Sequence, residues 1–69
     1  MKDKEPITVS RAVYEGIMAV RGSGKTNMFD IQMVASLAID SDHAEAGVWV
    51  LNNPREYAHG ISNGFEVVE

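Results

Sequence analysis

Helix-breaking signals recur along this chain and restrict it to short elements of secondary structure. The signals are Gly22-Ser23-Gly24, Asp40-Ser41-Asp42, Asn53-Pro54 and Asn63-Gly64. Glycine and asparagine end helices in the left-handed conformation, and proline cannot continue a helix. Between these signals, apolar residues recur with the period of an α-helix. The sequence therefore predicts four short helices, near residues 10–21, 30–39, 43–52 and 54–62.

Each predicted helix begins at a residue whose side chain suits an N-cap. Side-chain oxygens of Ser, Asp and Asn accept hydrogen bonds from the free N–H groups of the first turn. In the third and fourth helices a glutamate three positions later would complete a capping box, and Pro54 fits the first helical position. The predicted caps are Ser10, Asp30, Asp42 with Glu45, and Asn53 with Glu56.

The apolar residues also predict which side of each helix faces the core. Gly16 lies within the first helix, where glycine costs up to about 1 kcal/mol relative to alanine, so we expect another element to approach closely there. The predicted inward residues are Val9, Val13, Ile17 and Val20; Met33, Val34, Leu37 and Ala38; Val48, Trp49 and Leu51; and Tyr57, Ala58 and Ile61.

Both ends of the chain have strand-like sequences. Ile7-Thr8-Val9 is rich in β-branched residues, and Phe65-Glu66-Val67-Val68 begins with alternating apolar and polar residues. A two-stranded ribbon is stable only where helices cover it, so pairing of the two ends is left open. The predicted fold is mainly α: a compact bundle of four short helices, with a two-stranded β pair of the termini as an option. It forms one small domain over residues 1–69, with residues 1–6 flexible.

Size and charge narrow the classes of function. No cysteine occurs in the 69 residues, which excludes disulfides and thiolate zinc sites, so we expect tight helix packing or association with another chain. The net charge of -4 disfavours a general nucleic-acid binder, which needs a basic face. Apolar runs such as Val48-Trp49-Val50-Leu51 are too short to span a bilayer, and residues 1–6 lack the apolar region of a signal peptide. We expect a cytoplasmic protein without a membrane partner.

The segment Gly22-Ser23-Gly24-Lys25-Thr26 is similar to the end of a phosphate-binding P-loop. The full motif needs a glycine where this chain has Ala19, and a strand before the loop where a helix is predicted here. A helix end followed by a turn explains the glycines better. Arg21 and Lys25 flank the turn and are weak candidates for binding a phosphate or an acidic partner. We assign no catalytic, cofactor-binding or metal-binding residue and expect no cofactor.

Two further patterns have simple structural interpretations. Asp40, Asp42, His43 and Glu45 could be metal ligands, but a calcium loop also needs an acceptor at Ala44, a glycine after it and a later bidentate glutamate. The second and third helices, joined by a short turn, are also similar to a helix-turn-helix. The base-contacting end would read Ala44–Gly47, which lacks the Arg, Gln or Asn that reads bases. A small DNA- or RNA-associated regulator of helix-turn-helix type is kept as the alternative hypothesis because of the order of the elements, and this lack of base-reading residues makes it the weaker one.

Two blocks of the chain resemble a family of small proteins classed as a domain of unknown function. They are Ala19–Asp30, containing Thr26-Asn27-Met28-Phe29-Asp30, and Arg55-Glu56-Tyr57 with Ile61 after it. The resemblance covers roughly Ile17 to Gly64. It implies an origin in phages, prophages and other mobile elements of Gram-positive bacteria, and it implies no activity and no functional residues.

These observations together favour a protein that binds another protein and is not an enzyme. We expect an accessory factor that binds a host or phage protein, or that associates with itself. A specific version of this hypothesis is an inhibitor of a host defence system, such as an anti-CRISPR protein.

Overall fold

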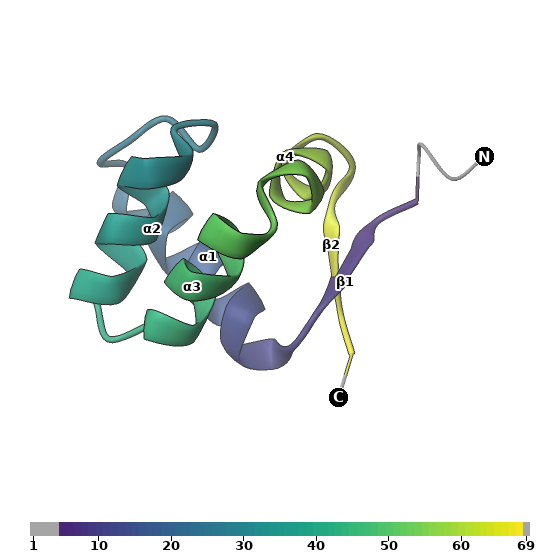
Figure 1. Ribbon diagram of the computed structural model, residues 1–69, viewed down its shortest axis with the longest axis horizontal. Helices are drawn as coiled ribbons and strands as arrows, with labels where there is room; N and C mark the ends of the chain where they lie inside the picture. Colours follow the sequence, from purple (N-terminus) through teal and green to yellow (C-terminus); the bar gives the residue numbers. More distant parts are fainter. Residues whose placement is uncertain (1–4, 69) are drawn as a thin grey trace.

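The computed structural model describes residues 5–68, which form four helices and two short strands. Figure 1 shows the strands side by side at one end of the molecule, with α4 (Pro54–Asn63) next to them and α2 (Ile31–Asp40) at the far end. The mainly helical fold is confirmed, and every helix lies close to its predicted range. The predicted flexibility of residues 1–6 falls mostly outside the described residues. The elements are β1 (Ile7–Val9), α1 (Arg11–Ser23), α2 (Ile31–Asp40), α3 (Ala44–Asn52), α4 (Pro54–Asn63) and β2 (Phe65–Val67).

The two terminal strands pair with each other, and they run parallel. Ile7 lies opposite Phe65, and Val9 lies opposite Val67. At the ends of the ribbon, the Ile7 N–H donates to the Gly64 carbonyl at 3.0 Å and the Val68 N–H donates to the Val9 carbonyl at 2.8 Å. The ribbon is covered by α4 and α1, which supplies the helix packing that so short a pair requires.

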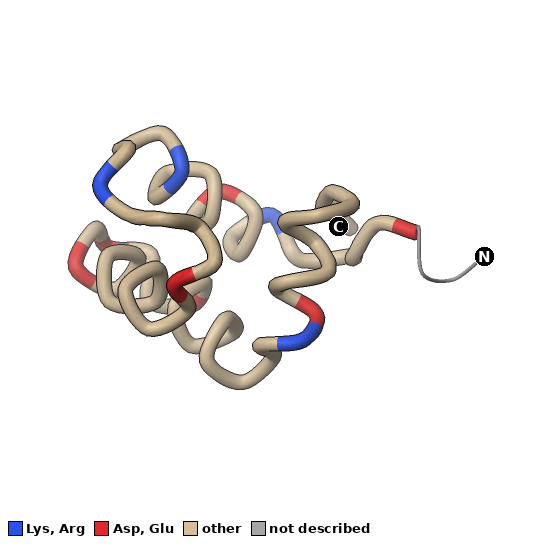
Figure 2. Tube along the Cα trace, turned by 90° about the horizontal axis from the view of Figure 1, so that it is seen from above, with Lys and Arg blue, Asp and Glu red and all other residues tan. Residues whose placement is uncertain are grey.

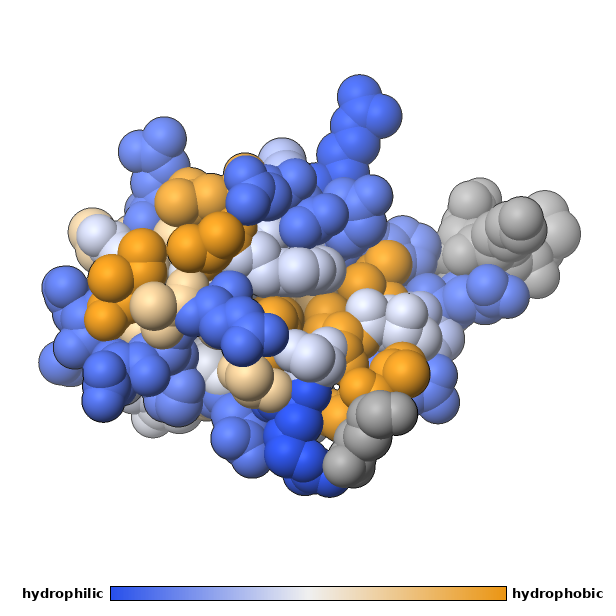
Figure 3. All heavy atoms as spheres, turned by 60° about the horizontal axis from the view of Figure 1, so that its bottom comes forward, coloured by the Kyte–Doolittle hydropathy of each residue, from blue (hydrophilic) through white to orange (hydrophobic). Residues whose placement is uncertain are grey.

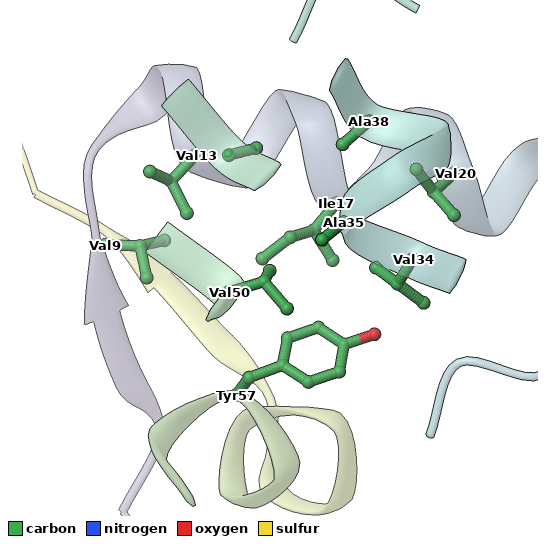
Figure 4. Close-up of a cluster of buried hydrophobic side chains, with 10 residues drawn as sticks. Val9, Val13, Ile17, Val20, Val34, Ala35, Ala38, Val50 and Tyr57 are labelled. Carbon is green, nitrogen blue, oxygen red and sulfur yellow. The ribbon is translucent and has the colours of Figure 1, made fainter. Parts of the chain in front are cut away.

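The core is built on the predicted apolar face of the first segment. Val9, Val13, Ile17 and Val20 are all buried, and they meet side chains from the other three helices. Figure 4 shows Ile17, Val34 and Val50 next to the ring of Tyr57, with Val9 and Val13 further away on one side. The buried residues from the other helices are Val34, Ala35, Ala38, Ala46, Val50 and Tyr57.

Small residues set how closely the helices approach one another. Gly16 of α1 lies directly against Ala46 of α3, where a Cβ atom on the glycine would collide with the Ala46 Cβ. This confirms the predicted close approach. A Cβ atom on Gly47 would lie 2.6 Å from Ile39 Cγ1 and 2.8 Å from the Ala35 carbonyl oxygen. Helix α3 therefore turns its smallest side chains toward both α1 and α2.

Three predictions of inward residues are wrong. Met33 on α2 is 46% exposed, and Val48 and Leu51 on α3 are 52% and 49% exposed. Trp49 is half-buried, and Ala46, Gly47 and Val50 are the buried residues of α3. Because α3 is apolar on almost every side, its period could not identify the inner face. Close approach at Gly47 decided it, and this left Val48 and Leu51 outside.

The predicted caps of α1 and α2 are confirmed, and the two capping boxes are wrong. Ser10 Oγ accepts the Val13 N–H at 3.3 Å, and Asp30 Oδ1 accepts the Met33 N–H at 3.2 Å. The residue at the N-cap position of α3 is His43, without a side-chain cap bond.

The turn geometry explains why Asp42 does not cap α3. Asp42 adopts a left-handed conformation with φ of 71°, and the His43 N–H bonds back to the Ala38 carbonyl at 2.8 Å. The turn is used to close α2, which displaces Asp42 from the cap position. Asn53 does occupy the N-cap position of α4, with Pro54 after it. Its side-chain amide, however, donates to the Trp49 carbonyl at 2.9 Å and so completes the end of α3.

Candidate functional site

Arg21 and Lys25 lie on either side of the turn that ends α1, and both are exposed. Figure 2 shows two basic segments on one loop at the end of the molecule away from the N-terminus. The Gly24 N–H donates to the Arg21 carbonyl at 3.3 Å, and the Lys25 N–H donates to Ser23 Oγ at 3.3 Å. In a P-loop such N–H groups point at phosphate. Here they close the helix, as expected of a C-cap.

Arg21, but not Lys25, also lines a groove between α1 and α4. The groove has a volume of about 230 Å³, and its walls include Tyr14, Met18, Ile61 and Phe65. The structure therefore separates the two predicted candidates: Arg21 borders the groove between α1 and α4, and Lys25 belongs to the loop after α1.

A larger groove of about 540 Å³ lies where β1, the start of α1 and the outer side of α3 meet. We call it the strand–helix groove. Its apolar walls are Val9, Val13, Val48, Trp49 and Val68. Among the described residues that line it, Glu45 is the only charged one.

The Glu45 carboxylate is held in place at this groove. Ser10 Oγ donates to Glu45 Oε2 at 3.2 Å, and the same Ser10 oxygen accepts the Val13 N–H. One hydroxyl thus caps α1 and orients the carboxylate of a residue on α3. The prediction of a capping box for Glu45 missed this role. Ser10 and Glu45 are 35 positions apart, so no local pattern indicates their contact.

The exposed side of α3 carries a row of apolar residues. Ala44, Val48 and Leu51 are spaced by four and three positions, so they lie on one side of the helix, and all three are exposed. Ile39 of α2 is 44% exposed and lies beside Gly47 of α3. We call these four residues the α3 apolar stripe. In Figure 3 hydrophobic side chains gather at the end formed by α2 and α3, and again near the paired strands.

The outer side of α3 lacks most features of a DNA-reading helix. Its exposed residues are Ala44, Glu45, Val48, Leu51 and Asn52. Only Asn52 has a side chain of the type that reads base edges, and Glu45 would face phosphates with a like charge. This surface is therefore mainly apolar, with one acidic side chain.

Two further polar side chains bond backbone carbonyls. Burial raises the pKa of Tyr57 to about 12, and its hydroxyl donates to the Met28 carbonyl. The His59 ring bonds the Glu5 carbonyl at 2.8 Å.

Within residues 5–68 no group of three or more His, Asp or Glu side chains is arranged to hold a metal ion. No helix in the same range has the length and apolar character needed to cross a membrane.

Comparison with known proteins places the chain in a family. No curated protein and no solved structure matches it. A family model described as Domain of unknown function (DUF5049) matches residues 9–65, from the last residue of β1 to the first residue of β2. The match includes all four helices and the loop from Gly24 to Asp30. The chain therefore belongs to the DUF5049 family.

Proposed function

We propose that the protein is a non-enzymatic accessory factor that binds another protein, is encoded by a phage or mobile element of Gram-positive bacteria and acts in the cytoplasm. The observation that carries the binding function is the α3 apolar stripe. Val48 and Leu51 each leave about half of their surface in water, and Ile39 extends the same surface onto α2. Contiguous apolar surface on a small protein marks a site of protein contact, because its burial is favourable.

The composition of the grooves supports binding over catalysis. Nucleophilic or acid–base chemistry needs a reactive group and a base in hydrogen-bond contact. In the strand–helix groove the described lining residues include Glu45 and Ser10, with no histidine, lysine or cysteine beside them. Their bond to each other serves to orient the carboxylate.

A pull-down with a matched control tests the proposed binding function. Tagged wild-type protein, Leu51→Asp and Ser62→Asp would be incubated with lysate of a Gram-positive host. Both changes add one negative charge at an exposed position, but only Leu51 belongs to the stripe. We expect a host protein to be retained by the wild type and by Ser62→Asp, and to be lost with Leu51→Asp. Identical retention by all three proteins would remove the support that the stripe gives.

The specific form of this proposal is inhibition of a host defence system. Small acidic proteins suit contact with the basic nucleic-acid channels of defence nucleases, and this chain has a net charge of -4. A plasmid-interference assay in a host with an active CRISPR system would measure this. We expect plasmid survival to rise when the protein is expressed and to return to baseline with Leu51→Asp. Unchanged survival with the wild type would limit the function to binding of another kind of partner.

A salt-titrated binding assay with duplex DNA addresses the alternative of a DNA-associated regulator. We expect no saturable binding near physiological salt, because the exposed side of α3 is apolar and acidic. Saturable binding that weakens with salt and depends on Asn52 would favour the regulator instead.

A further inference from the structure

The loop after α1 exposes several side chains on a backbone that is bonded to the core. Lys25, Asn27 and Phe29 are exposed, whereas Thr26 and Met28 are half-buried. The Met28 carbonyl accepts the hydroxyl of buried Tyr57, and the Phe29 N–H donates to Asn27 Oδ1 at 2.8 Å. The phenyl ring of Phe29 is 56% exposed although the backbone that carries it is attached to the core. An aromatic side chain presented in this way loses little entropy when it is buried by a partner.

The strand–helix groove has the complementary properties. It is open, and valines with Trp49 form the larger, apolar part of its walls beside the polar Thr8, Asn52 and Asn53. Ser10 orients the carboxylate of Glu45 at the same groove. Trp49 offers an aromatic surface, which favours contact with another aromatic ring. The groove is thus complementary to an apolar or aromatic side chain that has a cation nearby. Phe29 and Lys25 have these properties.

We propose that the protein associates with itself head to tail, with Phe29 of one copy in the strand–helix groove of the next and Lys25 pairing with Glu45. A copy cannot fill its own groove. The groove is lined by residues at the start of α1, and the loop follows the last residue of α1. A helix of 13 residues holds these two regions about 20 Å apart.

The charges of the loop are compatible with this contact. Asp30 follows Phe29, but its carboxylate accepts the Met33 N–H at the positive end of the α2 dipole. Lys25 and Arg21 are the exposed cations near the loop. A contact between two different surfaces is heterologous, so it generates open chains of molecules unless a rotation closes a ring. The surface involved is small, so the association is weak and needs high protein concentration.

Sedimentation velocity measures this association directly. Between about 20 µM and about 1 mM the weight-average sedimentation coefficient of the wild type should rise, because association follows mass action. Phe29→Ala should abolish the rise. A wild type that remains monomeric at the highest concentration overturns the proposal. This holds also if the groove then proves to bind a different protein.

A charge exchange tests the Lys25–Glu45 pairing. Lys25→Glu and Glu45→Lys should each stay monomeric alone, because each places like charges at the contact. An equimolar mixture of the two should associate again, because both of the alternating contacts then join opposite charges. Arg55→Glu and Glu56→Lys make the same changes of charge at exposed positions on α4 and should associate as the wild type does.

The charge exchange tests self-association, whereas the pull-down tests binding of a foreign protein, so either proposal can fail without the other. Association that survives Lys25→Glu and Phe29→Ala would place the contact on another face and overturn the proposal, as would a mixture that fails to associate. Denaturant unfolding of every variant confirms that it is folded. Leu51→Asp should lose the foreign protein while retaining self-association, since Leu51 does not line the groove.

Discussion

At the scale of single residues, Tyr57 connects three parts of the molecule. Its side chain is fully buried, its hydroxyl donates to the Met28 carbonyl in the loop before α2, and its ring lies 6.1 Å from that of Phe65 in β2. A buried hydroxyl needs a partner, and the Met28 carbonyl is that partner. The sequence predicted that Tyr57 points inward, but not which backbone group it bonds.

The burial of Tyr57 makes stability depend on pH in the alkaline range. Its pKa rises from 10.0 to about 12 in the folded protein, so the folded state retains a proton that the unfolded state loses. This contribution is fully present below pH 10 and decreases as pH rises toward 12. We expect the urea midpoint to fall over this range and to fall less in Tyr57→Phe. Tyr14→Phe, the matched control, should keep the wild-type decrease; a Tyr57→Phe curve that parallels the wild type would contradict this origin.

Asn53 is a second residue whose role depends on its neighbours. Asn53→Ala removes the bond to the Trp49 carbonyl, so the free energy of unfolding should fall by about 1 kcal/mol. Asn52→Ala, one position earlier and exposed, serves as the control and should change it little. Chemical denaturation followed by tryptophan fluorescence measures both. Equal midpoints for wild type and Asn53→Ala would show that this bond contributes nothing.

At the scale of elements, two glycines in one helix have opposite roles. Gly16 lies where α1 touches α3, and a Cβ atom there would also come within 2.9 Å of the His43 Cβ. For Gly22, in the last turn of the same helix, the described residues beyond its chain neighbours and the helix backbone place no atom within 4 Å of the position a Cβ would occupy. The first glycine allows the two helices to approach, whereas the second only weakens the helix.

Alanine substitutions at these two positions should therefore change stability in opposite directions. Gly16→Ala should lower the free energy of unfolding by about 1–3 kcal/mol, the usual cost of overpacking a close contact. Gly22→Ala should raise it by up to about 1 kcal/mol, because alanine is the better helix former. Thermal and urea unfolding give both values. Stabilisation by Gly16→Ala would mean that α1 and α3 are further apart than the structure places them.

At the scale of the whole molecule, Phe65 links the terminal ribbon to the helices. Its ring lies against Gly60 of α4, and it meets the ring of Trp49 edge-on at 6.3 Å. The ribbon joins the segment before the four helices to the segment after them. Loss of this contact should thus affect the backbone at both ends of the chain.

Phe65→Ala should cost about 2 kcal/mol, less than a fully buried phenylalanine because this one is half-buried. Hydrogen exchange should show that the amides of Ile7 and Val68, which bond across the ribbon, lose protection together. Val68→Ala is the control, since its side chain is 55% exposed and should matter little to stability. Unchanged protection of the Ile7 amide in Phe65→Ala would show that the ribbon does not depend on this ring.

The sequence by itself determined the number, order and approximate limits of the helices. These are local properties: glycine, proline and asparagine break helices wherever they occur, and Ser10 and Asp30 bond within their own first turns. It also determined the inner face of α1, because Val13, Ile17 and Val20 recur with the period of a helix and all three are buried. The strand-like character of the two ends was also visible in the local sequence. Their parallel pairing was not, because it joins segments far apart in the chain.

Tertiary structure alone decided the surfaces on which the functional proposals rest. In α3 nearly every residue is apolar, so only the approach of α1 and α2 to Ala46 and Gly47 could choose which side to bury. That choice exposed Val48 and Leu51. It also brought Glu45 to Ser10, 35 positions away in the chain. The physical reason is that a local pattern fixes the period of a helix, whereas its orientation depends on how closely its neighbours can pack.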